Sequence, residues 1–252
     1  MSSSAFRFAF ITDPQLGMNS PSGLRGPGSD KERFDRAIAY VNDNDIAFVV
    51  LGGDQINDAD NEHTDEELDI LEESLAALTV PYYGVAGNHE QLGPGDGCKY
   101  LDRGLPVRFS LTHGNLHMIG INGPWLRAGC GDEWHQREWD YLTSQLSQIP
   151  AECNHRFIVM HYPLFYQMPI STDDDLGMPN HAKIIDLYEA HGITCVLSGH
   201  LHQDMDARWR GISLIASIGT AMSVHYPEEA AFKVITVFED GWSVRRVAVE
   251  DG

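Results

Sequence analysis

Residues 8–17, FAFITDPQLG, join a short apolar run to an acid, a proline and a glutamine. An apolar run of this length predicts a buried strand, and the turn residues after it predict that the strand stops at Asp13. A metal centre at such a strand end is expected to carry a histidine, rather than Gln15, two residues after the acid. Two interpretations are open: a metal centre with one unusual ligand, or a strand that simply ends in a turn.

The net charge of the chain argues against several classes of binding partner. Its 252 residues include 17 basic and 37 acidic ones, which gives a formal net charge of −20. Such a surface repels nucleic acid and anionic lipid, and it repels phosphorylated substrates unless a cation lies in the cleft. No apolar run approaches the ~20 residues that cross a bilayer, and the N-terminal MSSSAFRF lacks a signal-peptide pattern. We therefore expect a cytoplasmic protein without a membrane segment.

The four cysteines, Cys98, Cys130, Cys153 and Cys195, form no Cys-x-x-Cys pair. A zinc knuckle or a thioredoxin-like motif is therefore not expected. Four free thiols are the plain interpretation, and a Cys98–Cys130 disulfide between loops is left open.

Strand patterns and helix patterns alternate along the chain, without a repeat or a linker. We expect one α/β (α+β) domain over residues 1–252. The SDKE at Ser29–Glu32 and the TDEE at Thr64–Glu67 both match the capping box that begins helices. Apolar stripes predict helices after these boxes, around 139–146 and around 184–190, the last with Gly192 as its C-cap. Predicted strands are 6–11, 46–51, 81–85, 156–160, 195–198, 212–218, 231–238 and 242–249, with a hairpin over 108–122 that turns at Gly114-Asn115.

Five of the predicted strands end in polar residues that can bind metals. Because ligands of α/β sheets bind at the carboxyl ends of strands, these segments are expected to converge. Two cations ~3.5–4 Å apart need a bridging carboxylate, which Asp54 can supply. Each segment alone is weak support, since turns with Gly-Gly-Asp and lone histidines are common; together they indicate a metal site. The segments carry Asp13 with Gln15, Asp54, Asn88-His89-Glu90, His161, and His200 with His202.

The motifs DPQ, GGD, GNHE, MHYP and GHLH occur in this order over roughly residues 5–220. They resemble the calcineurin-like metallophosphoesterase family, whose pattern is Asp-x-His, Gly-Asp, Gly-Asn-His-Asp/Glu, a lone His and Gly-His-x-His. The DPQ variant is similar to the subgroup of calcineurin-like phosphoesterase domain-containing protein phosphatases, where glutamine replaces the histidine. The resemblance implies a four-layer α-β-β-α sandwich of two mixed β-sheets flanked by helices, with a dinuclear metal site at the C-terminal ends of strands.

The resemblance also implies roles for the site residues. A metal-bridging hydroxide would attack phosphorus, and His89 would protonate the leaving group or act only as a hydrogen-bonding neighbour. Gln15 would either ligate through its amide oxygen, which ligand preference favours, or hydrogen-bond a metal-bound water. Glu90 would orient His89 or cap the next turn. The two expected cofactors are ions of manganese, iron or zinc, with magnesium as a further option. One ion would be held by Asp13, Gln15, Asp54 and His202, and the other by Asp54, Asn88, His161 and His200.

The expected activity is that of a phosphatase acting on a phosphorylated small molecule or a phosphoprotein. A phosphodiesterase of the same fold, acting for example on a cyclic nucleotide, is the alternative, and a metal-binding scaffold without catalysis is the third. Asn57 and Asp58 stand where the large protein phosphatases of the family carry Asp-Arg, which argues against that branch. Loops 17–29, 91–106 and 165–180 are expected to select the substrate. Candidate substrate contacts are Asn88, His89, Arg25, Arg103, Arg127 and His225.

Overall fold

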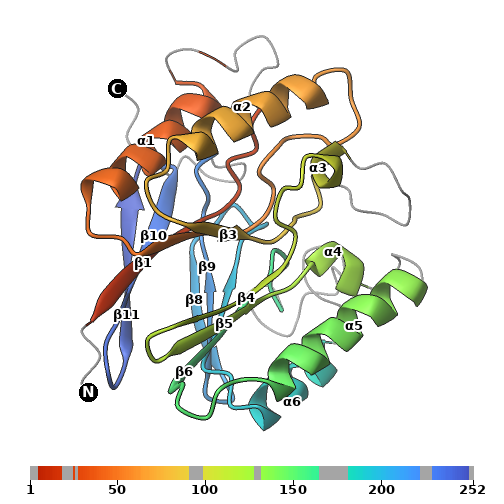
Figure 1. Cartoon of the computed structure of the whole chain (residues 1–252), viewed down its shortest axis with the longest axis vertical. Coiled ribbons are helices and arrows are strands. Elements are labelled where there is room, and N and C mark those ends of the chain that lie inside the picture. The colour runs from red at the N-terminus through yellow and green to blue at the C-terminus, as the bar shows by residue number, and fades with distance from the viewer. Residues whose placement is uncertain are drawn as a thin grey trace.

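Two mixed β-sheets pack face to face in the computed structural model (Figure 1). The structure describes residues 5–18, 25, 28–90, 99–127, 132–164, 181–221 and 229–249. The first sheet has the strand order β11 (Trp242–Ala248), β10 (Ala231–Val237), β1 (Phe6–Ile11), β2 (Phe48–Leu51) and β3 (Tyr82–Gly84). The second has the order β4 (Phe109–His113), β5 (Leu116–Gly120), β6 (His155–Val159), β7 (Cys195–Ser198), β9 (Ile212–Ala216) and β8 (Met205–Trp209).

The direction of the strands explains why one edge of each sheet gathers strand ends. β1, β2 and β3 run parallel to one another, and so do β5, β6, β7 and β9. The remaining strands, β10, β11, β4 and β8, pair antiparallel at the margins. Parallel strands have their carboxyl ends at the same edge, and this is where α/β proteins place their ligands.

Helices cover the outer faces of both sheets (Figure 1). They are α1 (Asp30–Asp43), α2 (Thr64–Ala76), α3 (Lys99–Asp102), α4 (Gly123–Leu126), α5 (Asp132–Ser147) and α6 (His181–Ala190). α1 and α2 pack on the first sheet through Phe34 and Leu71, and α5 and α6 pack on the second through Leu142 and Ile185. None of the helices in the described ranges is long and apolar enough to cross a bilayer.

Alternation of side chains along β1 separates two apolar layers. Phe8 and Phe10 point into the layer between the sheets, where the ring of Phe8 lies 6.4 Å from that of Phe157. Ala9 and Ile11 point the other way, toward the helices. This is the period-two pattern of a strand buried on both faces, and the predicted four-layer α-β-β-α sandwich is confirmed.

The two predicted capping boxes have different outcomes. Ser29 caps α1 as expected, since its side chain accepts the N–H of Glu32 at 3.1 Å. The prediction for Thr64–Glu67 is wrong, because Thr64 already lies inside α2 and His63 occupies the N-cap without a side-chain bond. The Thr64 hydroxyl instead donates to the carbonyl of Asp58 at 3.0 Å, in the loop before the helix.

Most other elements agree with the prediction, including the hairpin at Gly114-Asn115 and the left-handed Gly192 after α6. Three short elements are absent from the prediction: β8, α3 and α4. β8 is an exposed edge strand, and the two helices have four residues each. Segments this short carry too few apolar positions to show a period.

Candidate metal centre

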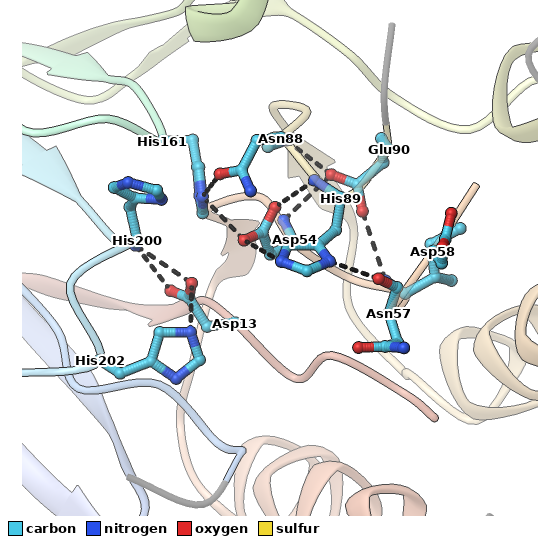
Figure 2. A network of polar contacts seen from close by, with 12 residues as sticks. Asp13, Asp54, Asn57, Asp58, Asn88, His89, Glu90, His161, His200 and His202 are labelled. Atoms are coloured by element: carbon cyan, nitrogen blue, oxygen red, sulfur yellow. Dashed lines mark hydrogen bonds and ion pairs between the residues drawn. The ribbon is translucent and has the colours of Figure 1, made fainter. Parts of the chain in front are cut away.

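The polar strand-end residues meet at one place, above the carboxyl ends of both sheets (Figure 2). The first sheet contributes Asp13 and Gln15 after β1, Asp54 after β2, and Asn88 with His89 after β3. The second contributes His161 after β6, and His200 and His202 after β7. The convergence that the strand pattern predicts is therefore present in the fold.

The loops after β1 and β2 run side by side and continue the pairing of their strands. The N–H of Asp13 donates to Gly53 O at 3.0 Å, that of Gln15 to Asp54 O at 2.9 Å, and that of Leu16 to Gln55 O at 3.1 Å. Backbone bonds of this kind hold the two acid-bearing loops at a fixed separation. The positions of the Asp13 and Asp54 side chains are thereby set by the sheet.

Backbone strain is concentrated at the same residues. In the described part of the chain, six non-glycine residues have a positive φ, and five of them are predicted metal ligands. A left-handed conformation costs an L-residue about 1 kcal/mol or more and persists where the surrounding structure imposes it, commonly at functional sites. The five are Asp13 (φ 50°), Gln15 (37°), Asp54 (51°), His200 (70°) and His202 (48°).

One group of ligand atoms surrounds Asp54. The Nε2 atom of His161 lies 3.0 Å from Asp54 Oδ2 and 3.2 Å from Asn88 Oδ1. The other ring nitrogen, Nδ1, donates to the carbonyl of Gly52 at 2.9 Å, which directs Nε2 into the site. Asp54, His161 and His200 offer ligand atoms that all lie within 4.8 Å of one another. Such a set of one carboxylate and two imidazoles is suited to a transition-metal ion.

A second group surrounds Asp13. Its carboxylate accepts the hydroxyl of Thr12 at 2.6 Å and the backbone N–H of His200 at 3.1 Å. The Nε2 atom of His202 lies 3.4 Å from Asp13 Oδ1. Gln15 is 3% exposed, and no hydrogen-bond partner for its Oε1 lies among the described residues.

A buried acceptor without a partner is costly, and a cation within reach of the Gln15 amide oxygen would satisfy it. The donor set around Asp13 therefore fits a second metal ion. The amide oxygen adds a hard, neutral ligand to a carboxylate and an imidazole.

Two glycines allow the close approach that this arrangement needs. A Cβ atom at Gly87 would lie 2.1 Å from Asp54 Oδ1, and one at Gly199 would lie 2.3 Å from Asp13 Oδ2. Any side chain at these positions would displace a carboxylate. Glycine in GNHE and in GHLH is thus required by packing against the acids.

Burial and pairing shift the pKa values of the central groups in the metal-free site. Burial lowers the pKa of the His161 imidazole, but the charge of Asp54 and the bond to it outweigh burial and raise that pKa to about 9. Burial likewise opposes ionisation of Asp54, yet His161 holds the pKa of Asp54 well below its usual range. Burial raises the pKa of Asp13, and His202 offsets part of that increase. His161 and Asp54 therefore form a buried ion pair.

His89 is placed beside the ligands with an open ring edge. Its backbone N–H donates to Asp54 Oδ1 at 2.9 Å, and its Nδ1 donates to the carbonyl of Asn57. The Nε2 atom lies 3.9 Å from Asp54 Oδ2, and the side chain is 33% exposed. The ring is therefore fixed at Nδ1, and its Nε2 faces Asp54.

The carboxylate of Glu90 binds backbone N–H groups on two sides of the site, and the turn that it is predicted to cap lies outside the described residues. Its buried carboxylate accepts the backbone N–H groups of Asp54 (3.0 Å), Gln55 (2.7 Å), Ile56 (3.3 Å) and Gly87 (2.6 Å). Burial and the charge of Asp54 raise the pKa of Glu90 to about 7. Glu90 thus joins the loop after β2 to the loop after β3.

The three arginines that are candidate substrate contacts have different partners in the structure. Arg25 pairs with Glu73 at 2.7 Å, and Arg103 pairs with Glu72 at 2.6 Å and with Asp69 at 2.8 Å, so α2 engages both. Arg127 lies over the ring of Tyr162, 4.6 Å from its centroid, and Tyr162 in turn contacts the ring of His200. Tyr162 was not predicted, although it directly follows His161. His225, Cys98, Cys130 and loop 165–180 lie outside the described residues.

Known proteins share this sequence pattern and fold. The sequence profile described as calcineurin-like phosphoesterase matches residues 6–204. Serine/threonine-protein phosphatase CPPED1 of Danio rerio is 22% identical over 237 residues, which cover 85% of this chain and 76% of that protein. The 3′,5′-cyclic adenosine monophosphate phosphodiesterase CpdA of Haemophilus influenzae is 19% identical over 243 residues, 92% of this chain and 82% of CpdA. A dimetal phosphatase from Danio rerio has the same fold, with a TM-score of 0.73 at 18% identity over 98% of this chain and 97% of that one.

Proposed function

We propose that this chain, which belongs to the calcineurin-like phosphoesterase family, hydrolyses phosphate monoesters at a dinuclear metal centre. The family makes it a metal-dependent phosphoesterase. The observation that supports two metals is the presence of two donor groups, one around Asp54 and one around Asp13, with five of the donors held in left-handed backbone conformations. Single-domain organisation and a cytoplasmic location are part of the same proposal.

The ligand assignment follows the two groups. Asp13, Gln15 and His202 would hold one cation, Asn88, His161 and His200 the other, and Asp54 would contact both. When bound, such a pair of cations activates water as a nucleophile and offsets charge on the phosphoryl oxygens. Manganese, iron, zinc and magnesium all fit mixed oxygen and nitrogen donors. The oxygen of Gln15 favours manganese, iron or magnesium at its site.

His89 is the proposed proton donor to the leaving group. The carbonyl of Asn57 retains the proton on Nδ1, so a protonated ring can give up only the proton on Nε2. That nitrogen lies 3.9 Å from Asp54 Oδ2, next to the candidate ligands. A proton donor is useless to a scaffold that only binds metal, so this geometry supports catalysis over the scaffold alternative.

Two substrate classes are compatible with the site. Likeness to CPPED1 supports a phosphomonoester, either a small molecule or a phosphoprotein side chain. Likeness to CpdA, which extends over 92% of the chain, supports a cyclic nucleotide diester as the second candidate. Because p-nitrophenyl phosphate and its bis-ester differ only in the class of ester, they separate the two.

The test combines these two substrates with metal analysis of the purified protein in added manganese. We expect two metals per chain and hydrolysis of the monoester alone. Hydrolysis of the bis-ester alone would establish the diesterase instead. Bound metal without hydrolysis of either ester would establish the scaffold.

A further inference from the structure

Glu67 of α2 lies outside the five motifs that carry the candidate metal ligands, yet its carboxylate is buried against the loop behind His89. The residue is 1% exposed. Its Oε2 atom accepts the backbone N–H of Asn57 at 3.0 Å and that of Asp58 at 3.1 Å. Burial of a carboxylate is costly unless hydrogen bonds compensate for it. The two bonds therefore fix the loop after β2 relative to α2.

The same loop holds His89 at two points. The carbonyl of Asn57 accepts the ring Nδ1–H of His89, and the N–H of Ala59 donates to the carbonyl of His89 at 3.0 Å. Figure 2 shows the ring of His89 between Asp54 and Asn57. The orientation of the ring thus depends on where this loop lies.

One peptide unit links Glu67 to His89. The carbonyl of Asn57 and the N–H of Asp58 belong to the same planar trans peptide, so they point in opposite directions. Glu67 accepts on one side of this unit and His89 donates on the other. A carboxylate on the N–H polarises the peptide and strengthens its carbonyl as an acceptor.

The carboxylate of Glu67 packs closely against Gly17. A Cβ atom at Gly17 would lie 2.5 Å from Glu67 Oε1, so the carboxylate rests directly on the backbone of Gly17. The N–H of Asn57 also donates to Leu16 O at 3.0 Å. Loss of Glu67 would leave the N–H of Asn57 one acceptor and would remove the bond from the N–H of Asp58 to Glu67.

We propose that Glu67 is a positioning residue for His89, acting through the Asn57–Asp58 peptide. It holds the ring proton on Nδ1 and leaves Nε2 directed at the leaving group. This inference rests on the proposed function, in which His89 protonates the leaving oxygen.

The test compares an ester with a good leaving group, p-nitrophenyl phosphate, with one that needs protonation, glycerol 2-phosphate. Loss of a general acid costs about 10²–10⁴-fold where the leaving group must be protonated, so His89→Ala should lose this much kcat on the alkyl ester and far less on the aryl ester. Glu67→Met should show the same selectivity, with a loss on the order of tenfold on the alkyl ester, a fraction of that general-acid effect. Glu67→Gln keeps one acceptor oxygen and should restore wild-type kcat.

Three controls separate positioning from general damage. Glu66→Met removes the exposed neighbouring acid of α2 and should match wild type on both esters. The metal content of Glu67→Met should equal that of wild type. In the metal-free protein, nitrogen NMR of the His89 ring should show the proton on Nδ1 in wild type and less of it there in Glu67→Met.

The outcomes distinguish the two proposals. Wild-type inactivity on both esters would overturn the proposed function and this inference with it. The role of Glu67 alone would be overturned if His89→Ala shows the selective loss but Glu67→Met does not. Glu67→Met would then lose activity equally on both esters, lose metal, or lose no activity. Should Glu67→Met fail to fold, Glu67→Asp, which withdraws the carboxylate by one methylene, should give a smaller loss of the same selectivity.

Discussion

The Nε2 atom of His161 lies 3.0 Å from Oδ2 of Asp54, and both nitrogens of the ring face acceptors, since Nδ1 donates to Gly52 O. This is the environment of an imidazolium. The raised pKa of His161, about 9, agrees with it. The metal-free site therefore holds a proton where a metal ligand needs a lone pair.

Metal binding should release that proton. At pH 7.5 His161 is protonated in the metal-free protein, so each cation bound at its Nε2 displaces close to one proton. Apparent metal affinity should rise by up to about tenfold per pH unit below the pKa of His161. Calorimetry in two buffers of different ionisation enthalpy measures the proton count, and His161→Gln should lower it. A heat of binding that is independent of the buffer would contradict the prediction.

The metal-free protein should lose stability as pH rises. The pKa of His161 lies above its unfolded value of 6.5, so its contribution is complete below pH 6.5 and is lost as pH rises through about 9. The loss is about 3 kcal/mol of unfolding free energy. The raised pKa of Glu90 acts in the same direction between pH 4.5 and about 7.

Urea unfolding of the chelator-treated protein measures this dependence. The same series for His161→Gln should be flatter above pH 6.5. Rising stability of the wild type between pH 6.5 and 9 would show that the Asp54–His161 pair does not form.

Asp54→Asn should abolish activity and metal loading together. The carboxylate of Asp54 is the only predicted ligand shared by both cations, and metal ions supply several kcal/mol of transition-state stabilisation, so kcat should fall by at least about 10³-fold. Metal content and hydrolysis of p-nitrophenyl phosphate are measured on the same sample. Asp45→Asn, at an exposed acid, serves as the matched control. Full activity in Asp54→Asn would refute the mechanism.

Gln15→Leu should release one metal and leave the other in place. The substitution removes a buried oxygen from the group around Asp13 and retains the volume of the side chain. The affinity of that cation should fall by at least the about 10–100-fold that loss of a ligand's hydrogen-bond partner costs. Gln15→His, the usual residue of the family pattern, should keep two metals. Two tightly bound metals in Gln15→Leu would show that Gln15 does not ligate.

Gly87→Ala should disrupt the centre by contact alone. The added Cβ would lie 2.1 Å from Asp54 Oδ1, so the carboxylate or the loop must shift. Overpacking of this kind costs about 1–3 kcal/mol of unfolding free energy, and metal content should fall with it. Gly241→Ala adds the same methyl group where nothing lies within 4 Å and should be silent. Equal behaviour of the two variants in thermal unfolding would disprove the steric argument.

The sequence predicts the convergence of the candidate ligands well because each one follows a buried strand. The ends of the strands before Asp13 and Asp54 can be seen in the sequence, because the apolar runs stop there. Parallel pairing of the strands then brings these ends to the same edge of the sheet. The Asp-Pro-Gln variation is also visible in the sequence. Its orphaned amide oxygen is not, because burial of Gln15 depends on the loops around it.

The supporting carboxylates could not be predicted in the same way. Glu90 accepts backbone N–H groups from a loop 34 to 36 residues away in the chain, and Glu67 from a loop 9 to 10 residues away. Every residue except proline offers an N–H, so no motif marks the donor. The capping prediction at Thr64 is wrong for a similar reason. Its hydroxyl donates to a backbone carbonyl of the preceding loop, and no motif marks that acceptor. Arg25 and Arg103 are only candidate phosphate contacts in the sequence, and their pairing with α2 could not be predicted because it depends on how that helix is placed.

The left-handed residues of the metal centre have a consequence for how this protein can change over generations. At Asp13, Asp54 and His202 glycine would relax the main chain, yet glycine has no atom to offer a cation. Substitutions that stabilise the fold at these positions would thus remove the candidate metal ligands first. A descendant that no longer needed its reaction should be recognisable by glycines at these turns, with both sheets left intact.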